Sequence, residues 1–347
     1  MVRLRRVSPN SPGWTRRRHG RGLVYRDAEG EPLDPAQIQG VKELVIPPAW
    51  MDVWICPVPN GHIQVVGVDA AGRRQYIYHP AWRVQRDRLK FDRVSEIARK
   101  LPAARKAVML HLALDQMPLE RAAAAAVRLL DLGYFRIGSD VYADEHGSFG
   151  LTTLEKRHVR LRSGRLVFTF TGKSGVTHTV EIDDGEVMTA LEVMRRRRGG
   201  ERLLAYKAGR SWADIDASRV NAYLKELVGD ELTAKDFRTW HATVIAAAAL
   251  AASPESGDTP ASRKRAVRAA VVEVSEYLGN TPTIARSSYI DPRVIDLYED
   301  GVTIASAVRR GYRTPGERQA AVERAVLRLL SQAPENGGRV SRLRHEA

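Results

Sequence analysis

The chain has 347 residues, of which 44% are hydrophobic, and a formal net charge of +14. This length allows two domains, or one domain with a large appendage, and the positive charge favours a polyanionic partner, with nucleic acid ahead of a membrane surface. The single cysteine, Cys56, excludes an internal disulfide framework and any zinc site built from several cysteines.

The amino-terminal part of the chain predicts a small β domain. Residues 1–22 are rich in Arg, Gly, Ser and Pro, and we expect this basic segment to be mobile and to contact DNA through its charge. From Leu23 to about Trp82, short β-branched or aromatic runs are separated by turn signals such as Pro59-Asn60-Gly61, and the domain boundary is expected near Lys90. This pattern is typical of antiparallel strands, so residues 23–90 are predicted to form a β-rich domain.

Residues 91–333 predict a larger, mostly helical domain with a short β insert. Segments such as VSEIARKL and PLERAAAAAVRLLDLG repeat apolar residues at helical spacing. In the insert, the runs RLVFTFTG and VTHTVEID flank a hairpin turn at Lys173-Ser174-Gly175. The polar tail, residues 334–347, is expected to be frayed. The predicted fold class is therefore α+β, with a small antiparallel β-rich N-terminal domain and a larger helical catalytic domain.

Tyr289, in the segment LGNTPTIARSSYIDP, is the first candidate for catalysis. It follows three basic residues in separate settings, Arg136, Lys173 and Arg238. On so positive a chain, a tyrosine with dispersed cations fits nucleophilic attack on a DNA phosphodiester without a metal. The guanidinium fork of arginine matches two phosphate oxygens and stays charged, so it suits the negative charge that builds on the phosphate during the reaction.

The tyrosine and the lysine suit the two proton transfers of such a reaction. At pH 7 the loss of a phenol proton costs roughly 4 kcal/mol, which flanking cations reduce. Phenolate is a fair leaving group, so a phosphotyrosine bond is reversible without ATP, whereas the departing sugar hydroxyl needs a proton that Lys173 can supply. Taken alone, each arginine is more often a surface residue, Lys173 a solvated turn residue and Tyr289 a half-buried helix residue.

Four motifs together resemble one family in their order and spacing. They are RIGSDVYADEHGSFGLTTL, the GKSG hairpin, KDFRTWHAT and NTPTIARSSYIDP, and the β-rich part adds GRRQYIYHPAW. From about Leu23 to Asp291 the chain resembles the type IB DNA topoisomerases, in the poxvirus-like branch found in bacteria. The resemblance implies that Arg136 and Arg238 hold the scissile phosphate, that Lys173 is the general acid, and that Tyr289 becomes linked to the 3′ phosphate. It also implies DNA contacts by Gln75, Tyr76, Tyr78, Tyr142, Thr153 and Lys235.

The chain departs from this family pattern at one position. Nine residues before the tyrosine, where many relatives have histidine, it has Asn280. An asparagine amide can donate a hydrogen bond to a phosphate oxygen but can never carry a charge. Asn280 is therefore predicted to be a phosphate ligand.

The sequence favours a monomeric topoisomerase that clamps duplex DNA and relaxes supercoils by transient cleavage of one strand and religation. No His-Glu-x-x-His motif, glycine-rich phosphate loop or cysteine cluster is present, so no metal, ATP or other small-molecule cofactor is expected. No run is long and apolar enough for a membrane span, and no secretory signal is recognised, so the expected location is the cytoplasm, nucleoid-associated and bacterial.

Two alternatives remain open. A tyrosine recombinase or integrase shares the chemistry, but recombinases commonly carry histidine where this chain has Lys235, and they tend to begin with helices rather than strands. A non-catalytic, basic DNA-binding protein of the same fold would bind DNA without forming a covalent adduct.

Overall fold

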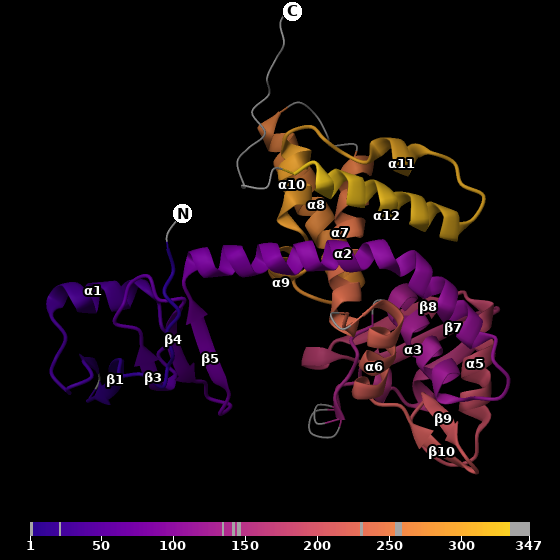
Figure 1. The fold of residues 1–347 in the computed structure, drawn as a ribbon, viewed down its shortest axis with the longest axis horizontal. Coiled ribbons are helices and arrows are strands. Elements are labelled where there is room, and N and C mark those ends of the chain that lie inside the picture. Colours follow the sequence, from indigo (N-terminus) through magenta and orange to yellow (C-terminus); the bar gives the residue numbers. More distant parts are fainter. Residues whose placement is uncertain are drawn as a thin grey trace, which may run out of the picture. The chain divides into compact units, whose positions relative to one another are not determined.

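The chain divides after Asp92 into two units that contain different kinds of secondary structure (Figure 1). In this computed structural model, the described residues are 3–20, 22–133, 135–140, 143, 147–229, 232–253 and 259–333. The first unit contains an antiparallel sheet, and the second is mostly helical, which confirms the predicted fold class. In these ranges, no helix combines the length and the apolar character that a membrane span requires.

A five-stranded antiparallel sheet, in the order β2-β1-β3-β4-β5, forms most of the first unit. Its elements are β1 (Trp14–His19), β2 (Gly22–Arg26), α1 (Pro35–Glu43), β3 (Met51–Ile55), β4 (Ile63–Val68) and β5 (Arg74–Tyr78). Helix α1 begins at a capping box, in which Asp34 accepts from the amide of Gln37 and the Gln37 side chain accepts from the amide of Asp34. Val41 of this helix belongs to the same buried cluster as Val53 and Val65 of the sheet.

The structure differs from the prediction that residues 1–22 are mobile. Residues 14–19 form β1, which pairs with both β2 and β3 inside the sheet. Arg16, in the middle of this strand, is only 7% exposed. Its guanidinium donates to three backbone carbonyl groups at 2.8–3.2 Å, those of Ile46, Pro47 and Trp50. Three consecutive arginines do not predict a strand from the sequence. Arg16 can be buried here because its hydrogen-bond acceptors come from a distant loop.

The second unit contains most of the helices, a three-stranded sheet in the order β6-β7-β8 and a two-stranded sheet of β9 and β10. Among the described residues, its helices and strands are α2 (Pro80–Leu112) from Arg93 onward, α3 (Leu119–Gly133), β6 (Val159–Arg162), β7 (Arg165–Thr171), β8 (Thr177–Ile182), α5 (Gly185–Arg196), β9 (Ala205–Ala208), β10 (Ser211–Asp214), α6 (Ala217–Val228), α7 (Ala234–Ala252), α8 (Pro260–Leu278), α9 (Pro282–Ser288), α10 (Pro292–Glu299), α11 (Ala305–Arg309) and α12 (Pro315–Ser331). Three short 3-10 turns are η1 (Leu151–Thr153), η2 (Lys156–His158) and η3 (Lys173–Gly175).

Helix α2 starts earlier than the sequence predicts. It begins at Pro80, directly after β5, whereas the helical part is expected from residue 91. Proline is well suited to the first position of a helix, where the missing N–H has no partner within the helix in any case. The helix enters the second unit at Arg93 and continues past Pro102 to Leu112.

Helix α3 is central to the core of the second unit. Its alanines, Ala122 to Ala126, have no exposed surface, and the helix packs against α5, α6, α7 and the strands β8 and β9. Alanine side chains are short, so neighbouring backbones approach the helix closely. The helix ends at Gly133, just before the segment that carries Arg136. Because the helix is held in the core, the position at which this segment begins is fixed.

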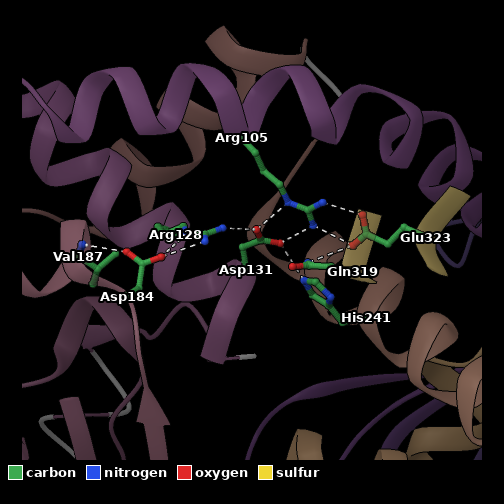
Figure 2. Close-up of polar contacts among 8 residues, drawn as sticks. All are labelled: Arg105, Arg128, Asp131, Asp184, Val187, His241, Gln319 and Glu323. Atoms are coloured by element: carbon green, nitrogen blue, oxygen red, sulfur yellow. Dashed lines mark hydrogen bonds and ion pairs between the residues drawn. The ribbon is translucent and has the colours of Figure 1, made fainter. Parts of the chain in front are cut away.

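A largely buried polar network joins four helices of the second unit (Figure 2). Arg105 of α2 donates to Asp131 of α3 at 2.8 Å and to Glu323 of α12 at 2.6 and 2.8 Å. His241 of α7 is hydrogen-bonded through Nε2 to Asp131 at 3.1 Å. Burial alone would raise the pKa of Asp131, but the hydrogen bonds from His241 and Arg105 hold it below its ordinary value. The network therefore connects α2, α3, α7 and α12 through matched charges.

The same network continues to α5 through a second arginine. Arg128 of α3 donates to Asp184 at 2.9 and 3.0 Å and to Asp131 at 3.3 Å. Asp184 also caps α5 by accepting from the amide of Val187 at 3.1 Å, as Figure 2 shows. The start of α5 is thereby tied to α3.

Candidate active site

Tyr289 lies in the break between two short helices. Helix α9 begins with Thr281 as N-cap and Pro282, and α10 begins with Asp291 as N-cap and Pro292. Since the residue before a proline is disfavoured in helical conformation, α9 cannot continue into α10. Tyr289 is the C-cap residue of α9, with φ −128° and ψ −31°, and its side chain is half-buried against the core.

Thr243 of helix α7 holds the backbone on both sides of the tyrosine's neighbour, Ile290. Its hydroxyl accepts from the amide of Asp291 at 3.1 Å and lies 3.4 Å from the carbonyl oxygen of Tyr289. It also donates to the carbonyl of Thr239 at 3.0 Å, and Thr243 itself is 2% exposed. The segment of Tyr289 is thus attached to the helix that carries Arg238. Sequence reasoning missed Thr243, because a threonine within an alanine-rich helix gives no signal of its distant partner.

Arg238 lies on the same helix and reaches the tyrosine ring. Its Nη2 donates to the carbonyl of Leu278 at 2.7 Å, and its guanidinium carbon lies 5.5 Å from the centre of the Tyr289 ring. Burial lowers the pKa of Arg238 to about 10; the charge of Arg136 acts in the same direction, and Tyr289 opposes it. A guanidinium group is therefore held beside the phenol, in a place where an added negative charge would be favourable.

Arg136 approaches from the segment that follows α3. Its Nη2 donates to the carbonyl of Gly279 at 2.8 Å and to Oδ1 of Asn280 at 2.6 Å. Burial lowers the pKa of Arg136. The loop is fixed at Gly138, whose φ of +100° suits glycine. There the backbone packs against Gly150 so tightly that a Cβ on Gly150 would lie 2.5 Å from Gly138 Cα.

Asn280 follows the left-handed C-cap of α8, Gly279, with φ +57° and ψ +48°. Its Oδ1 is occupied by Arg136, whereas its buried Nδ2 has no hydrogen-bond partner among the described residues. The amide group thus has N–H donors to offer a ligand. Arg136, Arg238, Asn280 and Tyr289 are therefore brought together by the fold, although they come from four different segments.

Lys173 stands apart from these four residues. It lies at the start of η3, at the tip of the hairpin between β7 and β8, and its side chain is exposed. Within the described ranges it makes no hydrogen bond or ion pair with the other four. An exposed lysine on a hairpin tip is nevertheless placed where it can reach a bound substrate.

The residues implied as DNA contacts lie in different surroundings. On β5, Tyr76 and Tyr78 stack with ring centres 5.8 Å apart, on the face opposite Ile77, which packs against the core of the first unit. Gln75 donates to Asp69 at 2.9 Å. Lys235 is exposed in the first turn of α7.

Two of the implied DNA contacts cannot be placed on an open surface. Thr153 is 1% exposed, and its hydroxyl donates to the carbonyl of Gly150 at 3.1 Å and accepts from the amide of Gly150 at 2.8 Å. In this structure Thr153 supports the loop of Arg136 rather than presenting its hydroxyl to a ligand. Tyr142 lies outside the described residues.

The described part of the chain contains no group of three or more His, Cys, Asp or Glu side chains arranged to hold a metal ion. The acidic groups near the core belong instead to the network of Figure 2, where they pair with arginines and a histidine.

Comparisons with known proteins match most of the chain. The family model for the catalytic core of eukaryotic DNA topoisomerase I matches residues 79–307, and that for the N-terminal domain of bacterial DNA topoisomerase IB matches residues 22–69. DNA topoisomerase 1B of Acanthamoeba polyphaga mimivirus is 27% identical over 286 residues, which cover 80% of this chain and 84% of that protein. DNA topoisomerase 1B of Vaccinia virus (strain Western Reserve) is 23% identical over 242 residues, which cover 68% of this chain and 72% of that protein.

A plant relative and a solved structure match shorter parts. DNA topoisomerase 1 alpha of Arabidopsis thaliana is 32% identical over 146 residues, 40% of this chain and 14% of that protein. A crystal structure of the XerH site-specific recombinase bound to the palindromic difH substrate, a post-cleavage complex, has a TM-score of 0.37 and 14% identity, and the match covers 58% of this chain and 50% of that one.

Proposed function

The chain belongs to the type IB DNA topoisomerase family and is a DNA topoisomerase, and from that premise we propose that Tyr289, Arg136, Arg238, Asn280 and Lys173 carry out its cleavage and rejoining of one DNA strand. The observation that carries this assignment is the position of the Arg238 guanidinium over the ring of Tyr289, 5.5 Å from its centre. This contact supports the proposal, because a phenol beside a cation can attack a phosphate that the cation holds.

In the cleavage step, the hydroxyl of Tyr289 loses its proton to solvent and attacks the phosphorus of the scissile phosphodiester. The new bond joins the tyrosine oxygen to the 3′ phosphate, and the bond from phosphorus to the 5′ oxygen breaks. Arg136 and Arg238 bind the non-bridging oxygens, where negative charge accumulates in the transition state. The Nδ2 donor of Asn280, which has no partner within the described residues, adds a neutral hydrogen bond to the same phosphate.

The departing 5′ oxygen receives its proton from Lys173. The exposed position of Lys173 on the tip of the β7–β8 hairpin leaves it able to approach bound DNA. Rejoining is the reverse reaction, in which the 5′ hydroxyl attacks the phosphotyrosine and phenolate leaves. Between the two steps the free 5′ end rotates, and torsional strain in the supercoiled duplex is released.

Because relaxation is energetically downhill, the proposed reaction uses no ATP, and because Arg136 and Arg238 stabilise the charge on the phosphate, it is proposed to use no metal ion. We further propose that the enzyme acts as a monomer in the cytoplasm on duplex DNA. Its high positive charge is expected to make binding weaken steeply with salt, since each phosphate contact releases counterions.

A suicide DNA substrate tests this function directly. It carries a nick just beyond the cleavage site, so the short fragment that bears the free 5′ hydroxyl diffuses away and the covalent adduct is trapped. Wild-type protein is expected to form an adduct that survives EDTA and denaturing electrophoresis, and Tyr289→Phe is expected to form none. An adduct that persists in Tyr289→Phe would overturn the assignment of the nucleophile, and one that disappears with EDTA would overturn the metal-free reaction.

A further inference from the structure

His178 is a titratable residue beside the active site that the proposed reaction does not yet use. It lies on β8 opposite Phe170 of β7, and the two rings stack with centres 5.5 Å apart and an interplanar angle of 29°. Strand and ring stacking together fix the imidazole on one face of the hairpin whose tip carries Lys173.

The imidazole ring of His178 fits between two glycines, and each of these glycines precedes a candidate catalytic residue. A Cβ on Gly172, next to Lys173, would lie 2.5 Å from Cδ2 and 2.6 Å from Nε2 of the ring. A Cβ on Gly279, next to Asn280, would lie 2.1 Å from Cε1 and 3.1 Å from Nε2. Any larger side chain at either glycine would clash with the imidazole, so the ring occupies the space between the lysine hairpin and the segment of Asn280.

The polar atoms and charges around this ring point to an anionic ligand. Nε2 is buried, and no hydrogen-bond partner for it exists among the residues that the structure describes. Burial, and then the charges of Arg136 and Arg238, lower the pKa of His178. An imidazole nitrogen without a partner, next to two guanidinium groups, is poorly stabilised until an anion binds beside it.

We propose that His178 is a further catalytic residue, which donates a hydrogen bond from Nε2 to a non-bridging oxygen of the scissile phosphate, next to the amide of Asn280. This inference rests on the proposed function. The backbone of Gly172 lies close to Nε2, since a Cβ there would be 2.6 Å from it, and the proposal therefore includes a shift of the hairpin that brings Lys173 to the phosphate and exposes this donor. A phosphate anion near the ring offsets the two guanidinium charges and favours the protonated imidazole, which adds a positive charge that Asn280 cannot supply.

Two variants of similar size separate the donor from the packing of the ring. His178→Met and His178→Gln both fill the space over Phe170, but only glutamine keeps an N–H donor. In single-turnover cleavage of the suicide substrate, His178→Met is expected to be about 100-fold slower than wild type, the usual loss for one preorganised donor. His178→Gln is expected to recover most of that loss. Thr179→Ala, the next residue on β8 with an exposed side chain on the other face, is the matched control and is expected to cleave at the wild-type rate.

Methylphosphonate substrates test whether His178 touches an oxygen. Each of the two diastereomers replaces one non-bridging oxygen of the scissile phosphate by a methyl group. If His178 donates to one of these oxygens, the defect of His178→Met disappears on the diastereomer that lacks it and persists on the other. An equal defect on the phosphate and on both diastereomers would show that the ring only supports the structure, and the proposal would be wrong. If His178→Met does not fold by circular dichroism, the same comparison is made with His178→Leu, which also lacks an N–H donor.

The wild-type protein separates this inference from the proposed function. Failure of wild type to form a Tyr289-dependent adduct would remove the proposed function and the role of His178 with it. A normal adduct in wild type together with wild-type rates in both His178 variants would remove His178 alone.

Discussion

Two arginines of the helical unit, Arg105 and Arg136, differ in the atoms that their guanidinium groups contact. Arg105 donates to the carboxylates of Asp131 and Glu323, whereas Arg136 donates to the carbonyl of Gly279 and the amide oxygen of Asn280. Burial by itself lowers the pKa of both groups. For Arg105, the hydrogen bonds that it donates to the two carboxylates reverse the direction and raise the pKa, but for Arg136 the pKa stays lowered.

This difference distinguishes the network around Arg105, which stabilises the fold, from the candidate active site around Tyr289. The charge of Arg105 is matched inside the protein, so its network stabilises the packing of the helices around it. The charge of Arg136 is held by neutral oxygens, so it remains available to an anion and costs stability until one binds. Variants of the network should therefore change the free energy of unfolding most, and variants of the site should change the rate of cleavage most.

The largest expected effect follows from breaking the network at its centre. Asp131→Asn leaves the partly buried guanidinium of Arg105 with one carboxylate instead of two and changes the partner of His241. We expect the free energy of unfolding to fall by about 3–5 kcal/mol, measured by urea denaturation followed by circular dichroism. Asp183→Asn is the control, because Asp183 is exposed and pairs loosely with Arg165 at 3.5 Å. An equal loss in the two variants would contradict the stabilising role of the network.

The opposite pattern is expected at the site. Arg136→Met removes a cation whose pKa is lowered by burial, so the free energy of unfolding should fall by much less than in Asp131→Asn. The rate of single-turnover cleavage should fall by about 10²–10³, the usual loss for one preorganised phosphate donor. Both quantities are measured on the same preparations. A large loss of stability with unchanged cleavage would mean that Arg136 belongs to the scaffold.

A smaller effect is expected from Thr243, which holds the backbone next to Tyr289. Thr243→Val keeps the shape of the side chain but leaves the amide of Asp291 without its acceptor. A lost hydrogen bond of this kind corresponds to about 1–2 kcal/mol, so cleavage should slow roughly tenfold. Thr239→Val, one turn earlier on α7, is the control, because among the described residues its hydroxyl donates only to the carbonyl of Lys235 in the same helix. Equal rates in the two variants would show that Thr243 does not position Tyr289.

The smallest effect concerns the pH dependence of stability. Because the pKa of Asp131 is held below its ordinary value of 3.8 in the folded chain, the carboxylate contributes stability above that value and loses it as the pH falls toward the lowered pKa. Below about pH 4, the wild-type protein should lose up to about 1.4 kcal/mol per pH unit through this group, and Asp131→Asn should lose correspondingly less. Urea denaturation at pH 5, 4 and 3 measures both slopes, and parallel slopes would contradict the assignment.

Motifs in the sequence identify the fold class and the family, and both predictions are confirmed. The same motifs name Arg136, Arg238, Asn280 and Tyr289, which the fold brings together. Each motif is a local run of residues, and a run such as KDFRTWHAT or NTPTIARSSYIDP carries the backbone features that present its side chain, including the Thr-Pro and Asp-Pro helix starts around Tyr289. Local chemistry of this kind can be recognised in the order of the amino acids alone.

Contacts between distant segments carry no such local signal. The sequence does not predict the strand at residues 14–19, because the hydrogen-bond acceptors of Arg16 come from residues 46–50. Thr153 lies in a motif that implies a DNA contact, yet its hydroxyl is buried in the turn at Gly150. Thr243 and His178 take on their positions through partners on other helices and strands.

The sequence by itself thus determined which residues of this protein carry cationic, nucleophilic and amide groups, because side-chain chemistry and helix ends are properties of short runs. Only the tertiary structure decided which of those charges are matched, since Arg105 meets carboxylates from α3 and α12 while Arg136 meets neutral oxygens 143 and 144 positions away in the chain. The physical reason is that the strength of an ionic interaction depends on distance and burial, and folding sets both.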